Sequence, residues 1–227
     1  MAEEIILALD TTSSPLLAAV NRAGKTAGVK KSGIKQEEFL FPAIQKALSK
    51  TGADLKSVTK VFFIKGPGRF TGIRIGLTAA TMLRSLNNAE AASATMFEVL
   101  KRGAEKSRGY KNWLKQNPGG NLAVVLHAFR EEYFLQIFGL TEPMWLTKED
   151  LFKFLSGVKT PLFITGFDKD RAPLGGLFKN FNYALGGAKL SRVTPALIIE
   201  SAKAKSFEPG TLEPLYLKPA RFEREWK

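Results

Sequence analysis

The 227-residue sequence predicts an α/β fold with two lobes, each a mixed β-sheet flanked by helices. The main observation is the order of elements in the first half, where apolar strand runs and helical patterns follow one another as β-β-β-α-β-α-β-α. A second hairpin-led series of strands begins near residue 122, after a segment rich in Lys, Gly and Asn. The composition, 44% hydrophobic and 24% charged, is that of a globular protein with a substantial core.

The elements of the first half follow from short apolar runs separated by turn residues. The run at 5–9 is a buried strand that ends at Asp10, and a Gly-containing turn joins the next two strands. The first helix has acidic residues near its start and Gly52 beyond its end, while Pro42 should kink it or mark a late start. Further strands are expected at 16–21, 26–31, 60–65 and 91–93, and helices are expected at 36–50, 71–86 and 95–106.

The second half repeats this pattern less clearly. Strands are expected at 122–126, 132–138, 143–146 and 161–165, with helices at 148–155 and 195–205. The sequence therefore predicts an N-terminal lobe at 1–105, a linker at 106–121 and a C-terminal lobe at 122–227. The terminal segment of the second lobe could return to the first.

The segment 66–72, Gly-Pro-Gly-Arg-Phe-Thr-Gly, joins a buried strand to a helix. Gly66 and Gly68 permit positive φ, and the junction directs free backbone N–H groups and the helix dipole at one point. Such a point suits a phosphate or the backbone of another protein. The alternative is a tight turn that needs glycine for close packing, since the segment lacks the Gly-Lys-Ser/Thr ending of a P-loop.

Four motifs carry a family resemblance. They are Ile-Leu-Ala-Leu-Asp-Thr-Thr at 6–12, the glycine loop and its helix at 66–77, Glu-Phe-Leu-Phe-Pro-Ala-Ile at 38–44, and Glu-Pro-Leu-Tyr-Leu at 213–217. These motifs, and their order along the chain, resemble the TsaB (YeaZ) family, except that Arg69 stands where serine is usual. The resemblance implies the actin/hexokinase-like fold, in which a nucleotide sits between two βββαβαβα lobes.

The resemblance also implies a function. The family takes part in making threonylcarbamoyladenosine beside the anticodon of tRNAs, as a non-catalytic scaffold that pairs with and activates the metal-containing relative TsaD. An ATPase, TsaE, binds the pair, and tRNA is engaged through the assembled complex. When alone, such a protein is expected to form a homodimer. No cofactor of its own is implied, since ATP and metal belong to the partner subunits.

The residues that could support catalysis are few. His127 is the single histidine and cysteine is absent, so no His/Cys metal site and no catalytic residue is expected. His127 stands where the family usually has Asp, and Gln36 where it often has His. Asp10 could ligate Mg²⁺ with a nucleotide, or cap its turn through Thr11 and Thr12. The nucleotide-like loops, expected to be vestigial, comprise Asp10, Thr11, Thr12, Gly66, Pro67, Gly68, Arg69, Phe70, Thr71 and Gly72.

The helix after the glycine loop is apolar nearly all round, which predicts burial on more than one face. Gly72, Gly76 and Ala80 form a smooth stripe, and each interior glycine costs roughly 1 kcal/mol relative to alanine unless another helix crosses closely. The resemblance implies a subunit interface here; the alternative is that both helices complete the lobe's own core. The expected pairing residues are Phe39, Leu40, Phe41, Ile44, Ile73, Ile75, Gly76, Ala79, Ala80 and Met82.

The net charge of +13 predicts attraction to polyanions such as RNA or to an acidic partner. Cations cluster at 101–115 and, near the C-terminus, at Lys218, Arg221, Arg224 and Lys227. No apolar stretch reaches a membrane span and no disulfide is available, which predicts a cytoplasmic protein without membrane contact. Two alternatives to the scaffold stay open: an active nucleotide-dependent transferase or kinase, and a tRNA-binding module.

Overall fold

The computed structural model describes residues 3–33, 35–179, 183–207 and 212–218. The described chain divides into two compact units, each built on a five-stranded sheet. The first unit combines residues of 1–99 and 194–215, and the second combines residues of 100–193 and 216–227. The division thus lies within helix α3 (Met96–Lys106), a few residues before the boundary expected at 105.

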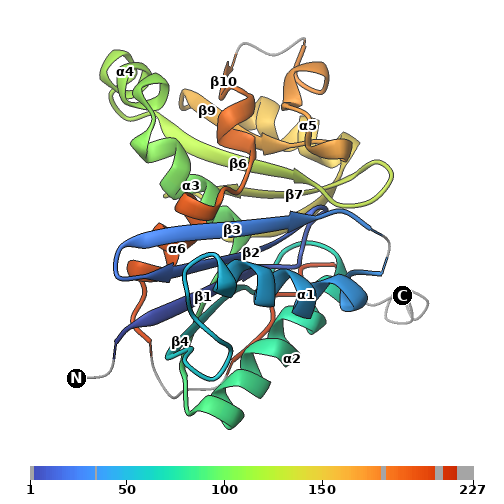
Figure 1. Ribbon diagram of the computed structural model, residues 1–227. Helices are drawn as coiled ribbons and strands as arrows, with labels where there is room; N and C mark the ends of the chain where they lie inside the picture. Colours follow the sequence, from blue (N-terminus) through green and yellow to red (C-terminus); the bar gives the residue numbers. More distant parts are fainter. Residues whose placement is uncertain (1–2, 34, 180–182, 208–211, 219–227) are drawn as a thin grey trace. The chain divides into compact units, whose positions relative to one another are not determined.

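The sheet of the first unit has the strand order β3-β2-β1-β4-β5 (Figure 1). Strands β1 to β3 form an antiparallel meander, while β4 and β5 continue the sheet parallel to β1. All six residues of the central strand β1 are buried, because both faces of the sheet are covered. The strands are β1 (Ile5–Asp10), β2 (Leu16–Arg22), β3 (Lys25–Lys31), β4 (Lys60–Ile64) and β5 (Glu90–Ala94).

Helices α1 (Gln36–Ser49) and α2 (Phe70–Asn87) cover one face of this sheet (Figure 1). Helix α1 contacts β2 and β3, whereas α2 contacts β4 and β5. Helix α6 (Pro195–Lys203) contacts β1, β2 and β3. Pro42 lies inside α1, so the helix starts at Gln36 despite the proline. The main core forms where alternate apolar side chains of β1 and β2 meet α1 and α2.

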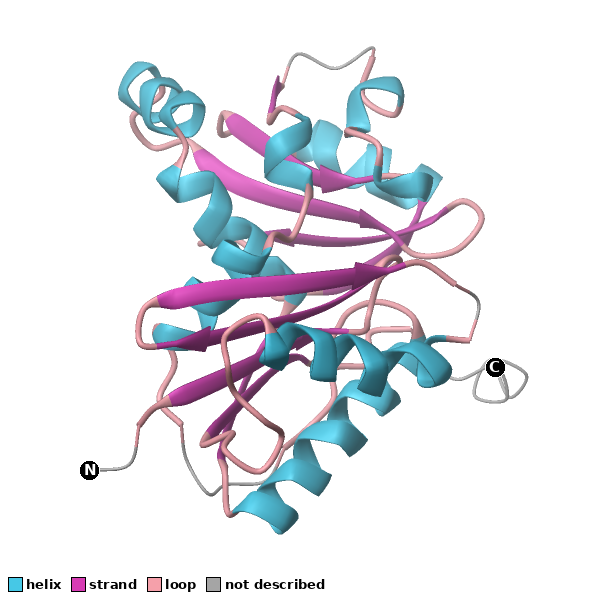
Figure 2. Ribbon diagram, in the orientation of Figure 1, coloured by secondary structure: helices cyan, strands magenta, loops and turns pink. Residues whose placement is uncertain are grey.

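The sheet of the second unit has the order β10-β9-β6-β7-β8. Figure 2 shows the strands of both sheets in magenta. Helix α5 (Lys148–Gly157) packs against β7 and β8. Three short 3₁₀ helices, Lys169–Arg171, Leu174–Gly176 and Ala188–Ser191, follow β9 or flank β10. The strands are β6 (Asn121–His127), β7 (Glu132–Ile137), β8 (Met144–Thr147), β9 (Leu162–Phe167) and β10 (Ala184–Leu185).

The expected linker at 106–121 is wrong for its central part, which forms helix α4 (Arg108–Gln116). The Ser107 hydroxyl caps this helix by accepting a hydrogen bond of 3.1 Å from the Tyr110 N–H. Tyr110 and Trp113 then pack against Phe163 of β9. A composition rich in Lys, Gly and Asn suggested a loop, but two aromatic side chains three residues apart anchor one helical face.

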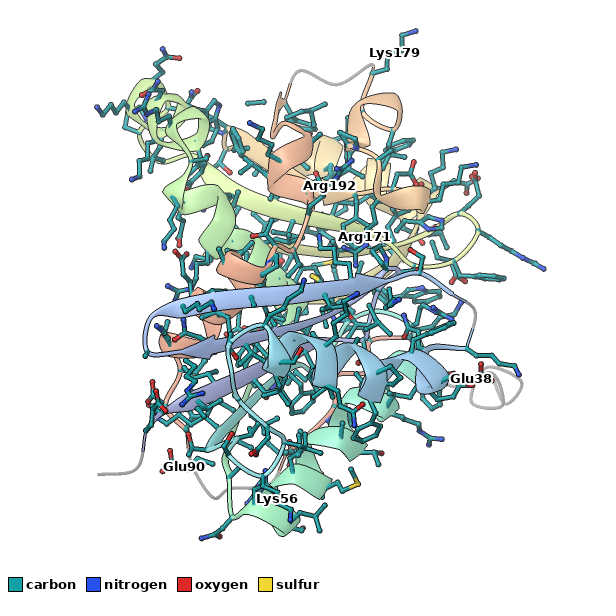
Figure 3. All side chains as sticks on the ribbon, viewed as in Figure 1. Glu38, Lys56, Glu90, Arg171, Lys179 and Arg192 are labelled. Atoms are coloured by element: carbon teal, nitrogen blue, oxygen red, sulfur yellow. The ribbon has the colours of Figure 1, made fainter. Side chains whose placement is uncertain are left out.

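Charged side chains of the first unit project away from its sheet, as Lys56 and Glu90 do in Figure 3. Several form surface ion pairs, among them Lys60 with Glu4 at 2.6 Å and Lys35 with Glu38 at 2.9 Å. Over the described part of the chain, no helix combines the length and the apolar character needed to cross a membrane.

The core of the second unit can be tested at α5, where two adjacent residues have opposite environments. Leu155 is fully buried, whereas Phe154 is 36% exposed. Replacing Leu155 by alanine removes buried methyl groups and leaves a cavity, so L155A should lower the free energy of unfolding by about 2 to 5 kcal/mol. Phe154→Ala is the control and should cost less than L155A. Urea unfolding followed by circular dichroism measures both, and equal losses would contradict this core assignment.

Candidate functional site

The glycine loop is held on three sides by backbone hydrogen bonds within its own unit. The Arg69 N–H donates to the Thr12 carbonyl at 2.8 Å, and the Met96 N–H donates to the Gly66 carbonyl at 2.7 Å. The Leu215 N–H donates to the Lys65 carbonyl at 2.7 Å. The loop therefore packs against the β1–β2 turn, the start of α3 and the chain segment after α6.

The segment after α6 lies directly over Gly66. Gly66 has a φ of +123°, a conformation that favours glycine, and a Cβ placed there would lie 2.5 Å from the Leu215 carbonyl oxygen. A Cβ at Gly68 would lie 2.5 Å from the Thr12 carbonyl oxygen. Both glycines thus allow another part of the chain to approach the loop closely, as the tight-packing alternative predicts.

Asp10, at the end of β1, is fully buried and its carboxylate bonds within its own turn. One oxygen accepts hydrogen bonds from the Thr12 N–H at 3.0 Å and from the Thr12 hydroxyl at 2.8 Å. The other oxygen accepts from the Ser13 hydroxyl at 2.5 Å. This is the geometry of a carboxylate that caps a turn. A role of Asp10 toward Mg²⁺ or a nucleotide stays a prediction.

Two interior glycines let helix α2 lie against the β1–β2 turn. The Thr11 hydroxyl donates to the Gly72 carbonyl at 2.6 Å, and a Cβ at Gly72 would collide with the Thr11 carbonyl oxygen. A Cβ at Gly76 would lie 2.6 Å from the Thr11 hydroxyl oxygen. Gly72 and Gly76 of the small-residue stripe therefore face the chain's own β1–β2 turn. Gly76 and Ala80 are buried within the first unit, and their contact with a second subunit stays a prediction.

The predicted pairing residues separate into two groups in the structure. Leu40, Ile44, Ile73, Gly76, Ala79 and Ala80 are buried, so most of them complete the core of the first unit. Phe39, Phe41, Ile75 and Met82 are partly exposed. The helix pair therefore completes the lobe's own core, as one alternative predicts, and also presents apolar side chains on its outer side. The subunit interface stays a prediction.

That outer surface contains a groove between α1 and α2, with a volume of about 290 Å³. Phe41 and Leu40 of α1 line one wall, while Ile75, Ala79 and Met82 of α2 line the other. Polar residues also line the groove: Glu37, Thr71, Arg74 and Thr78. Of the side chains named for pairing, five line this groove, although Leu40 and Ala79 contribute only a small exposed fraction.

The N-terminal end of α2 presents exposed side chains. Phe70 is 53% exposed, and the Arg74 guanidinium lies over its ring at 4.4 Å from the centroid. Arg69, at the departure from the family motif, is exposed and precedes the first residue of the helix. The exposed side chains at the end of the loop are therefore cationic and aromatic, whereas the loop backbone packs against the chain's own neighbouring segments.

The side chains of Gln36 and Glu98 form hydrogen bonds with segments that lie next to the glycine loop. Gln36 is buried, and its side-chain amide donates to the Ser13 carbonyl at 2.6 Å. Glu98 accepts from the Thr95 N–H at 2.6 Å and pairs with Lys205 at 2.6 Å. Partial burial raises the pKa of Glu98, but the hydrogen bonds from Lys205 and Thr95 more than offset this and hold it below its ordinary value.

His127 lies at the end of β6. Its Nε2 is 2.7 Å from the Arg130 carbonyl oxygen, and its ring contacts Tyr133 edge-on at 5.5 Å. Tyr133 donates to Asp168 at 3.3 Å, and burial, followed by the negative charge of Asp168, raises the pKa of Tyr133 to about 12. Among the described residues, no group of three or more His, Asp or Glu side chains is placed to hold a metal ion.

Comparisons with known proteins agree with this geometry. The family model described as "TsaD: tRNA N6-adenosine threonylcarbamoyltransferase" matches residues 31–97, which span α1, β4, α2 and β5. The "tRNA threonylcarbamoyladenosine biosynthesis protein TsaB" of Buchnera aphidicola subsp. Schizaphis graminum (strain Sg) is 36% identical over 81 residues, 35% of this chain. The chain spans 39% of the length of that curated relative.

Two solved structures from Pseudomonas aeruginosa share the fold. One, a protein with similarity to peptidase YEAZ, is 19% identical with a TM-score of 0.69 and covers 95% of this chain and 100% of its own. The other, YeaZ, is 19% identical with a TM-score of 0.64 and covers 94% and 100%. In sequence the chain is similar to TsaB over part of its length, and in fold it is similar to YeaZ. Its fold is the actin/hexokinase-like fold, as the order of elements predicts.

Sequence reasoning found the glycine loop and both helices but missed several supporting contacts. The contact between Lys65 and Leu215 joins residues far apart in sequence, and the Glu98–Lys205 pair does the same. No local pattern signals such pairs. One feature of the sequence pointed to Gln36: it is a polar residue at a position where the TsaB (YeaZ) family often has histidine. Of the C-terminal cations, Arg221, Arg224 and Lys227 lie outside the described residues.

The close contact of α2 with the β1–β2 turn can be tested by adding one methyl group. Gly72→Ala places a Cβ against the Thr11 carbonyl, so backbone must move, and we expect a loss of about 2 kcal/mol or more in the free energy of unfolding. Gly109→Ala in α4 is the control, because its Cβ would meet no atom within 4 Å. It should be neutral or stabilising by up to about 1 kcal/mol. A tolerated Gly72→Ala would refute the close contact.

Proposed function

We propose that this chain is a non-catalytic accessory subunit in the biosynthesis of threonylcarbamoyladenosine in tRNA, and that it pairs with and activates a TsaD-like catalytic subunit. The name of the curated relative and the matched family model support the pathway. The observation that carries the scaffold role is the groove between α1 and α2, an open apolar surface beside a glycine loop that is packed against its own chain.

The packing of the glycine loop argues for a supporting role. A phosphate cradle needs free backbone N–H groups at the helix start. Here the Arg69 N–H already donates to Thr12, and the carboxylate of Asp10 is engaged by Thr12 and Ser13. A nucleotide would have to displace these contacts. We therefore assign no cofactor to this chain and expect ATP and metal to belong to its partners.

The groove suits a protein partner because its lining is apolar over a rigid base. Phe41, Ile75 and Met82 are only partly covered, while the residues beneath them belong to the buried core. A helix of a partner could lay its apolar side into such a groove. Glu37 and Arg74 at the groove supply charges of both signs that would fix the partner's register. In the absence of the partner, two copies of this chain could cover the same surface.

The remaining partners follow from the same proposal. A TsaE-like ATPase would bind the assembled pair, and tRNA would reach the catalytic subunit in that complex. We place this role in the cytoplasm.

The pairing surface makes a prediction for purified proteins. Phe41→Asp together with Met82→Lys introduces charges into the apolar groove, so the variant should lose co-purification with the TsaD-like subunit by tenfold or more. Both side chains are partly exposed, so the chain should stay folded. Gel filtration with light scattering measures the complex, and circular dichroism measures the fold.

Leu86→Asp is the matched control for that experiment. Leu86 lies near the end of α2, is 70% exposed and does not line the groove. It should leave the complex intact. Retained pairing in the groove variant, or equal loss in the Leu86 variant, would refute the groove as the pairing surface. Gly76→Arg is unsuitable here, because it would collide with Thr11 and unfold the lobe.

A second candidate function is an active nucleotide-dependent transferase or kinase. The observation that favours it is the position of Asp10 at the end of β1, close in the fold to the glycine loop through Thr12. Calorimetric titration of the chain with ATP and Mg²⁺ separates the two functions. We expect no binding below millimolar ATP, because the loop and the carboxylate are already engaged. Sub-millimolar binding would favour the transferase.

A further inference from the structure

Helix α4 and the residues just before it carry a basic surface in the second unit. The sequence from 106 to 130 contains no Asp or Glu, but it contains Lys106, Arg108, Lys111 and Lys115, all of them exposed. The nearest acidic residue before the helix, Glu105, pairs with Lys101 at 3.7 Å. Among the described residues, no carboxylate forms an ion pair with Arg108, Lys111 or Lys115.

The orientation of α4 is fixed by its apolar side. Tyr110 lies 5.2 Å and Trp113 5.5 Å from the Phe163 ring, centroid to centroid, and the two rings stack on each other at 6.0 Å. Arg108, Lys111 and Lys115 then share the opposite side, because residues three, four and seven apart lie on one face of a helix. The cations are therefore presented on a rigid element instead of a flexible tail.

The basic side is also hollowed. A groove of about 450 Å³ is lined by Arg108, Lys111, Asn112, Leu114 and Lys115. All five side chains come from α4; four of them carry guanidinium, ammonium or amide groups on apolar stems, and none is a carboxylate. Figure 3 shows nitrogen-tipped side chains projecting outward around α4.

We propose that this face of α4, defined by Arg108, Lys111, Asn112 and Lys115, binds the phosphate backbone of RNA. Lys and Arg neutralise phosphates, and amide side chains such as Asn112 contact phosphate and sugar oxygens. A membrane surface fits less well, because both aromatic rings point inward and Leu114, 37% exposed, is the large apolar side chain of the groove. The choice of RNA over an acidic protein rests on the proposed function, whose substrate is a tRNA.

The test measures binding of the full chain to a fluorescent, unmodified tRNA transcript by anisotropy at several salt concentrations. Sequence-independent backbone binding typically has a Kd of about 10⁻⁴ to 10⁻⁶ M at physiological salt. The variant Lys111→Glu with Lys115→Glu removes two phosphate contacts. Its affinity should fall by roughly tenfold or more, and the slope of log affinity against log salt should become shallower by about two.

Lys153→Glu with Lys159→Glu is the matched control, since both lysines are exposed in the same unit and the net charge changes equally. It should keep most of the affinity. An equal loss in the control would overturn the proposal, because binding would then follow net charge alone. Unchanged tRNA affinity in the α4 variant would overturn it as well. The proposal would also fail if the α4 variant lost binding to polyglutamate or to phosphatidylserine vesicles but still bound tRNA.

The same variants separate this proposal from the proposed function. The α4 face lies on a different unit from the groove between α1 and α2, so the α4 variant should still co-purify with the TsaD-like subunit. Pairing kept with tRNA binding lost supports the α4 face. If no form of the chain pairs, the scaffold role fails, while the RNA measurement still decides the role of α4.

Discussion

The contact between the start of helix α2 and the β1–β2 turn governs the structure of the first unit. The Thr11 hydroxyl bonds the Gly72 carbonyl, and the Thr12 carbonyl accepts from the Arg69 N–H. Both bonds form because Gly68 and Gly72 have no Cβ to keep the two backbones apart. Interior glycine is costly in a helix, and here the close packing of backbone on backbone offsets that cost.

This contact also connects the buried loop with the exposed groove. Once the small residues of α2 face Thr11 and the sheet, Ile75 and Met82 are directed to the outer side of the helix, beside Phe41 of α1. The turn that closes the loop thus determines which apolar side chains stay available. We propose on this basis that the chain kept a nucleotide-binding architecture as a frame for pairing.

Much of this could be predicted from the sequence. The buried runs at 5–9 and 60–65 and the glycine loop marked β1, β4 and α2 because hydrophobic periodicity and glycine spacing are local signals. The inner face of α2 could not be assigned, since a helix that is apolar nearly all round has no unique buried side. Helix α4 was missed because Gly and Asn disfavour helices, whereas the packing of Trp113 on Phe163 depends on a strand about fifty residues later.

Hydrogen–deuterium exchange of the chain, alone and with the TsaD-like subunit, tests the central claim most directly. The account predicts new protection on 36–49 and 70–87, strongest in the peptides that contain Phe41 and Met82, with the β1–β2 turn already protected in the free chain. New protection confined to other segments would contradict a groove that serves as the pairing surface. Rapid exchange of the Arg69 amide in the free chain, whose N–H donates to the Thr12 carbonyl, would contradict the contact on which that groove depends.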